Sequence, residues 1–187
     1  MRLFIAINFN DDTRTRLLNL RDELRSRSVR GNFSSAENLH LTLVFIGEVN
    51  PKKIDKIKTI LDTITFSPFD VMIERLETFS RGTLWYAGLR EDKPLMMLQR
   101  EIEHKLALCD FEMDGRKYTP HITLGREVVT DAAPWQIEPF GETVTSIYLM
   151  KSERIGGKLT YTAIHTKKSD SNHKHDGYNN KTKIRRD

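Results

Sequence analysis

Two short stretches of this chain share a pattern of residues that could carry out acid–base chemistry. One reads His-Leu-Thr-Leu over residues 40–43, and the other reads His-Ile-Thr-Leu over residues 121–124. Each lies in a run with the composition of a β-strand, where successive side chains point to opposite faces. The histidine and the threonine of each copy therefore share one face, and the apolar residues point into a core. If the fold brings the copies together, two imidazoles and two hydroxyls converge on one site.

This set of side chains suits a phosphate ester. Two histidines can act as general acid and general base near neutral pH, and two hydroxyls can hydrogen-bond phosphate oxygens. A single His-x-Thr in a strand is ordinarily structural, but here the pattern occurs twice in a chain with six histidines. A zinc site is the alternative, and it needs three or four ligands. Neither copy has a carboxylate or a second histidine, so we expect no metal.

Hydrophobic spacing predicts the elements that must position these residues. Helices are predicted over about 10–26, 50–64 and 92–106. Strands are predicted over about 1–8, 38–47, 69–79, 83–89, 118–126, 143–151 and 159–166, with a further short strand between Val29 and Phe33. Arg81-Gly82 and Gly156-Gly157 are predicted turns, and residues 132–140 are predicted to form an irregular loop.

The order of these elements indicates the fold class. Hairpins among helices are typical of an α+β fold with mainly antiparallel sheets. One motif falls in each half of the chain, each time after a helix. This favours a pseudo-two-fold arrangement in which the motifs face each other across a groove.

Composition bounds the class of protein further. The chain has 187 residues, 38% hydrophobic and 30% charged, and no apolar run approaches a membrane span. The single cysteine, Cys109, is predicted to lie in the core and fits a reducing cytoplasm. The net charge of +4 equals the basic excess of residues 167–187, so it identifies no partner of the remaining chain. We therefore expect one domain over residues 1–166 and a disordered basic tail over 167–187.

The motifs and their surroundings resemble a known family. The segment NLHLTLVFIGEV (residues 38–49) and the segment YTPHITLGR (residues 118–126) resemble the paired HxTx motifs of the 2H phosphoesterase superfamily. Within it, the chain is similar to the RNA 2′,3′-cyclic phosphodiesterases, also called the 2′-5′ RNA ligase family. The opening RLFIAI, the segment TLWYAGL and the last hairpin, with Ser152, Gly157 and Tyr161, extend the resemblance to about residue 166.

The resemblance implies a bilobal fold with two antiparallel sheets lining a V-shaped groove and helices outside. It implies hydrolysis of RNA 2′,3′-cyclic phosphates to 2′-phosphomonoesters without metal or other cofactor. By this resemblance His40 is the proton donor, His121 is the proton acceptor, and Thr42 and Thr123 hold phosphate oxygens. Arg126 matches a basic position after the second motif. Its strand parity is opposite to that of His121, so it reaches the phosphate only if the strand twists or ends nearby.

Other functions remain open from the sequence. The same site could join a 5′-hydroxyl to a cyclic phosphate by the reverse reaction. The protein could instead be a module that binds RNA ends or nucleotides without turnover, or it could belong to a branch acting on another cyclic phosphate. We expect a cytoplasmic monomer whose partners are RNA ends or nucleotides bearing a 2′,3′-cyclic phosphate, with no membrane.

Overall fold

The computed structural model describes residues 1–79, 82–113 and 115–170. Within these residues the helices are α1 (Asp11–Ser26), α2 (Ile54–Asp62) and α3 (Lys93–Ala107), with 3-10 turns η1 (Ala36–Asn38) and η2 (Pro51–Lys53). The strands are β1 (Arg2–Asn8), β2 (Ser28–Phe33), β3 (His40–Glu48), β4 (Phe69–Thr78), β5 (Trp85–Leu89), β6 (His121–Thr130), β7 (Trp135–Val144), β8 (Ser146–Ile155) and β9 (Lys158–Lys168). Among the described residues, no helix is long and apolar enough to span a bilayer.

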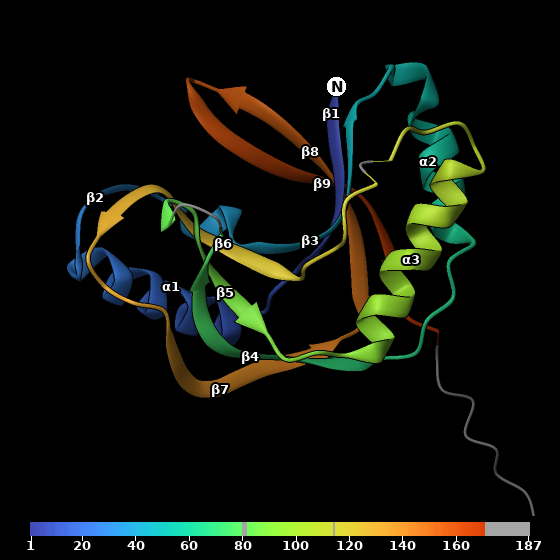
Figure 1. The fold of residues 1–187 in the computed structure, drawn as a ribbon. Coiled ribbons are helices and arrows are strands. Elements are labelled where there is room, and N and C mark those ends of the chain that lie inside the picture. The colour runs from blue at the N-terminus through green and yellow to red at the C-terminus, as the bar shows by residue number, and fades with distance from the viewer. Residues whose placement is uncertain (80–81, 114, 171–187) are drawn as a thin grey trace, which may run out of the picture.

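The strands form two antiparallel sheets (Figure 1). One sheet has the order β3-β1-β8-β9, and the other has the order β2-β6-β5-β4-β7. Helix α1 packs on β2, β6 and β7 of the second sheet, whereas α2 and α3 lie together on the opposite side of the molecule. The predicted α+β class, with helices outside two antiparallel sheets, is confirmed.

Side-chain caps start the first and third helices where the sequence predicts. The Asn10 side chain accepts a hydrogen bond from the Thr13 backbone amide at 2.8 Å, and Asp92 does the same for Leu95 at 2.8 Å. Asn50 caps the turn η2, which leads into α2. These caps fix where α1 begins after β1, where η2 begins after β3 and where α3 begins after β5.

One predicted element is wrong. Residues 132–140 do not form a loop, because most of them belong to β7, which pairs antiparallel with β4. Pro139 suggested irregular structure, but β7 lies at the edge of its sheet, where a missing backbone donor costs little. The predicted short strand near Val29 is present as β2. Arg81, in the predicted turn, lies outside the described residues.

The predicted domain boundary at residue 166 falls inside a strand. Strand β9 continues to Lys168, and the Ser169 amide donates to Thr145 O at 2.8 Å. The Asp170 amide then donates to Phe66 O at 2.8 Å. The contacts of the domain therefore reach at least Asp170. The rest of the predicted tail, residues 171–187, lies outside the described residues.

Candidate active site

Each motif begins a strand and alternates between two faces as predicted. In β3, His40 and Thr42 are half-buried while Leu41 and Leu43 are fully buried. The first four residues of β6 repeat this pattern, with Ile122 and Leu124 in the core. The core side of each strand is apolar and rigid. The histidine and the threonine are therefore held side by side on the opposite face.

The fold brings the two motifs together. The Tyr118 hydroxyl, three residues before the second histidine, donates to the backbone oxygen of Thr42 at 2.9 Å. Strands β3 and β6 also pack against each other, although they belong to different sheets. The charge of Arg126 acts on both His40 and His121. The two imidazoles and the guanidinium thus belong to one site.

A β-bulge explains how Arg126 reaches this site. In β6, Tyr86 pairs with Thr123 but Trp85 pairs with Gly125, so Leu124 is an extra residue. Leu124 and Gly125 are both buried, so the alternation of buried and exposed residues shifts by one position. Arg126 consequently returns to the face of His121. A side chain on Gly125 would have its Cβ only 2.7 Å from Val128 Cγ2, which explains the glycine there.

The first motif carries the same bulge. In β1, Ala6 pairs with Thr42 and Ile5 pairs with Val44, so Leu43 is the extra residue. The position that corresponds to Arg126 is therefore Phe45, which is 43% exposed. Its ring lies 4.9 Å from the guanidinium carbon of Arg2. The pseudo-two-fold relation thus extends past the motifs, but the residue types after the bulges differ.

Backbone carbonyls orient both imidazoles in the same way. Nδ1 of His40 lies 2.8 Å from Asn38 O, and Nδ1 of His121 lies 2.8 Å from Thr119 O. A carbonyl only accepts, so Nδ1 carries the hydrogen in both rings and Nε2 is left for proton exchange. Nε2 of His40 lies 3.0 Å from Thr42 Oγ1, whose hydroxyl donates to it when the ring is neutral.

Two aromatic rings contact each histidine and also contact each other. The ring centroids of Phe4 and Tyr161 lie 4.9 and 5.1 Å from that of His40 and 5.1 Å from one another. Those of Phe79 and Tyr86 lie 4.9 and 5.6 Å from that of His121 and 4.3 Å from one another. These four aromatic residues were not among the predicted site residues. Phe4 stands in an unbroken apolar run, so its place on the site face, opposite Leu3 and Ile5, is not visible from alternation.

Burial among these rings lowers the pKa of both histidines. For His40 the pKa falls from 6.5 to about 4, mainly through desolvation and then through the charges of His121 and Arg126. For His121 the pKa falls for the same main reason, and Arg126 again contributes. Burial and the neighbouring positive charge of Arg126 therefore favour the neutral form of both imidazoles.

The second motif also offers a hydroxyl group to a ligand. Thr123 lies beside His121 on the site face, and its side chain makes no hydrogen bond to any described residue. It can therefore donate to a ligand oxygen.

Across the described parts of the chain, no group of three or more His, Cys, Asp or Glu side chains is arranged to hold a metal ion.

Two antiparallel sheets, each presenting one histidine and one threonine at a matching motif, define the fold of a two-histidine (2H) phosphoesterase. The family model of the 2′-5′ RNA ligase superfamily matches residues 12–156. The chain belongs to this superfamily, as the resemblance of its motifs indicates.

Relatives and solved structures agree with this assignment. A protein of Archaeoglobus fulgidus named RNA 2′,3′-cyclic phosphodiesterase is 32% identical over 162 residues, covering 81% of this chain and 90% of the relative. A protein of Thermotoga maritima with the same name is 32% identical, covering 67% of this chain and 70% of the relative. The crystal structure of Escherichia coli LigT complexed with 3′-AMP superposes with a TM-score of 0.80 at 25% identity, covering 91% of this chain and 98% of LigT.

Proposed function

We propose that the protein hydrolyses terminal 2′,3′-cyclic phosphates of RNA to 2′-phosphomonoesters by two-histidine acid–base catalysis. The observation that carries this proposal is the matched pair of imidazoles. Each has Nδ1 held by a backbone carbonyl 2.8 Å away, which leaves Nε2 for proton transfer. The names of the relatives support RNA as the substrate class.

The proposed reaction uses one proton transfer at each histidine. Nε2 of His121 accepts a proton from water as the water oxygen attacks phosphorus. The bond from phosphorus to the ribose O3′ breaks on the opposite side, and Nε2–H of His40 protonates the departing oxygen. Thr42, Thr123 and Arg126 donate to the phosphoryl oxygens, whose negative charge grows in the transition state. The product is a 2′-phosphate beside a free 3′-hydroxyl.

The lowered pKa values place a condition on this mechanism. With a pKa of about 4, His40 is neutral at pH 7 when the site is empty. A bound phosphodiester anion favours the protonated imidazole, since an opposite charge within a few ångströms raises the pKa of a histidine. In the proposed mechanism, His40 therefore takes up its proton when the substrate binds, and it acts as an acid only in the complex.

We further propose that the protein is a monomer and that it is cytoplasmic. Both motif strands and the bulge that carries Arg126 come from one chain, so the site needs no second copy. Its single cysteine suits a reducing compartment. Light scattering of the purified protein tests the monomer, for which a mass near 21.8 kDa is expected.

Turnover in the presence of a chelator tests the function. The purified protein with EDTA is incubated with adenosine 2′,3′-cyclic phosphate and with a short RNA that ends in a cyclic phosphate. Hydrolysis of both by the wild type, and of neither by His40→Ala or His121→Ala, is the expected result. Tight binding of both without hydrolysis would identify a binding module instead, and a strict metal requirement would contradict the mechanism.

A further inference from the structure

The side chain of Tyr118 connects the two motifs. It lies three residues before His121, in a segment between α3 and β6 whose described residues belong to no helix or strand. Its hydroxyl donates to the backbone oxygen of Thr42 at 2.9 Å. Thr42 lies in β3, at the edge of the first sheet, whereas β6 is an inner strand of the second sheet. The hydrogen bond therefore crosses from the entrance of one motif to the middle of the other.

In the first motif, this bond ends on the residue that contacts the proposed proton donor. Oγ1 of Thr42 lies 3.0 Å from Nε2 of His40. Tyr118 and His40 thus contact the same residue, one at its carbonyl and the other at its hydroxyl. A shift of the Thr42 backbone would move this hydroxyl relative to the nitrogen that exchanges the proton.

In the second motif, a stiff length of chain joins Tyr118 to the proposed proton acceptor. The backbone oxygen of Thr119, the next residue, lies 2.8 Å from Nδ1 of His121. Pro120 has a nearly fixed φ, and it restricts the residue before it to extended conformations. The position of Tyr118 therefore helps to set where the Thr119 carbonyl and the His121 ring lie.

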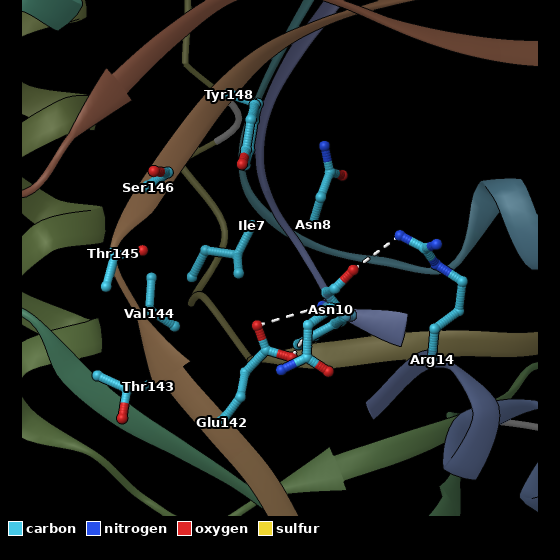
Figure 2. A pocket seen from close by; sticks show the side chains of 11 residues that line it. Ile7, Asn8, Asn10, Arg14, Glu142, Thr143, Val144, Thr145, Ser146 and Tyr148 are labelled. Carbon is cyan, nitrogen blue, oxygen red and sulfur yellow. Dashed lines mark hydrogen bonds between the residues drawn. The ribbon is translucent and has the colours of Figure 1, made fainter. Parts of the chain in front are cut away.

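Other contacts hold the two sheets together away from the motif histidines. One apolar core includes residues of both sheets, such as Leu41 of β3 and Ile122 of β6. Another hydrogen bond joins the sheets where the Asn10 backbone amide, just after β1, donates to Glu142 of β7 at 3.0 Å (Figure 2). Loss of the Tyr118 hydroxyl should therefore leave the fold intact and change only how the motifs lie relative to each other.

We propose that Tyr118 is a positioning residue whose hydroxyl fixes the separation and mutual orientation of His40 and His121. This inference rests on the proposed function, in which the two imidazoles act on opposite sides of one phosphorus atom. Such a reaction is sensitive to geometry, since a misplacement of about 1 Å can lower a rate about a hundred-fold. Burial raises the pKa of Tyr118, so its hydroxyl remains a donor throughout the pH range in which the imidazoles titrate.

Tyr118→Phe tests the proposal, because it removes the hydroxyl and keeps the ring. Thr130→Val is the matched control, since it removes a hydroxyl that donates to Arg27 O at 2.5 Å from the opposite end of β6. Both variants should lower the melting temperature. With adenosine 2′,3′-cyclic phosphate, Tyr118→Phe is expected to lower kcat about ten-fold and to change KM less than about three-fold, whereas Thr130→Val should change neither more than about two-fold.

A binding measurement separates this inference from the proposed reaction. The five-coordinate vanadium of adenosine 2′,3′-cyclic vanadate resembles the transition state, and adenosine 2′-monophosphate resembles the product. By calorimetry, Tyr118→Phe is expected to weaken the vanadate about ten-fold and the monophosphate less than about three-fold. Unchanged vanadate affinity in Tyr118→Phe, or an equal loss in Thr130→Val, would overturn the positioning role. The expected binding results in a protein that hydrolyses no cyclic phosphate would overturn the proposed reaction alone.

Discussion

Replacement of Arg126 by glutamine tests two consequences of the bulge in β6. One is the proposed contact of the guanidinium with a phosphoryl oxygen, and the other is the effect of its charge on the pKa values of His40 and His121. The guanidinium stands on the site face because Leu124 is an extra residue, and it is proposed to hold a phosphoryl oxygen. A hydrogen bond to a charged group contributes roughly 1.5–3 kcal/mol. Its loss from the transition state should lower kcat/KM by about ten- to a hundred-fold, since 1.4 kcal/mol is a factor of about ten.

The same variant should move the pH profile. The pKa of His40 and the pKa of His121 are lowered mainly by burial, and the positive charge of Arg126 lowers both further. Removing that charge makes each imidazole easier to protonate, so both pKa values rise. The reaction needs one protonated and one neutral ring, which gives a bell-shaped profile with two macroscopic pKa values. In Arg126→Gln the whole bell for kcat/KM should therefore shift to higher pH.

Arg126→Lys is the matched control for this experiment. It keeps the positive charge and loses the planar fork that can hold two oxygens. Initial rates on adenosine 2′,3′-cyclic phosphate, measured from pH 4 to 9, should show a reduced height but an optimum near that of the wild type. An optimum in Arg126→Gln that stays in place or moves to lower pH would refute the electrostatic reasoning.

The remaining predictions concern the histidines, one hydroxyl, acid stability and the chain end. His40→Ala and His121→Ala should each lower kcat by about two to four orders of magnitude with an unchanged circular dichroism spectrum. Thr42→Val should be milder, about ten-fold in kcat/KM, because the hydroxyl donates a hydrogen bond but transfers no proton to the substrate. Because the pKa of His40 is lowered to about 4 in the folded state, the unfolded state binds more protons between pH 6.5 and 4, and the free energy of unfolding falls as the pH falls. In His40→Gln this fall should be smaller by up to about 3 kcal/mol, measured by urea titration at each pH. Truncation after Asp170 should preserve hydrolysis of a cyclic nucleotide and the melting temperature, whereas truncation after Thr166 should lower the melting temperature because it removes the end of β9.

The sequence predicts what depends on local alternation and spacing. His40 and Thr42 share a face because a strand alternates, and α1 begins after Asn10 because a short polar side chain caps it. Strand β7 could not be predicted with the same rules. An edge strand tolerates Pro139, and its position at the edge is a property of the whole sheet.

The place of Arg126 shows the limit of alternation most clearly. Simple parity puts it on the core side of β6, opposite His121. The bulge at Leu124 reverses that parity, and it is visible only in the pairing of β6 with β5. The same applies to Phe4 and Tyr161, which come together around His40 from distant parts of the chain. Long-range pairing, which no local pattern encodes, decides these positions.

The identity of the product tests the central claim most directly. Adenosine 2′,3′-cyclic phosphate is hydrolysed in ¹⁸O-labelled water with EDTA present, and the product is followed by phosphorus NMR. Acid catalysis by His40 and base catalysis by His121 predict adenosine 2′-monophosphate with one labelled oxygen on phosphorus and an unlabelled 3′-hydroxyl. A 3′-monophosphate would contradict the assigned orientation of acid and base, and label in the ribose hydroxyl would contradict attack at phosphorus.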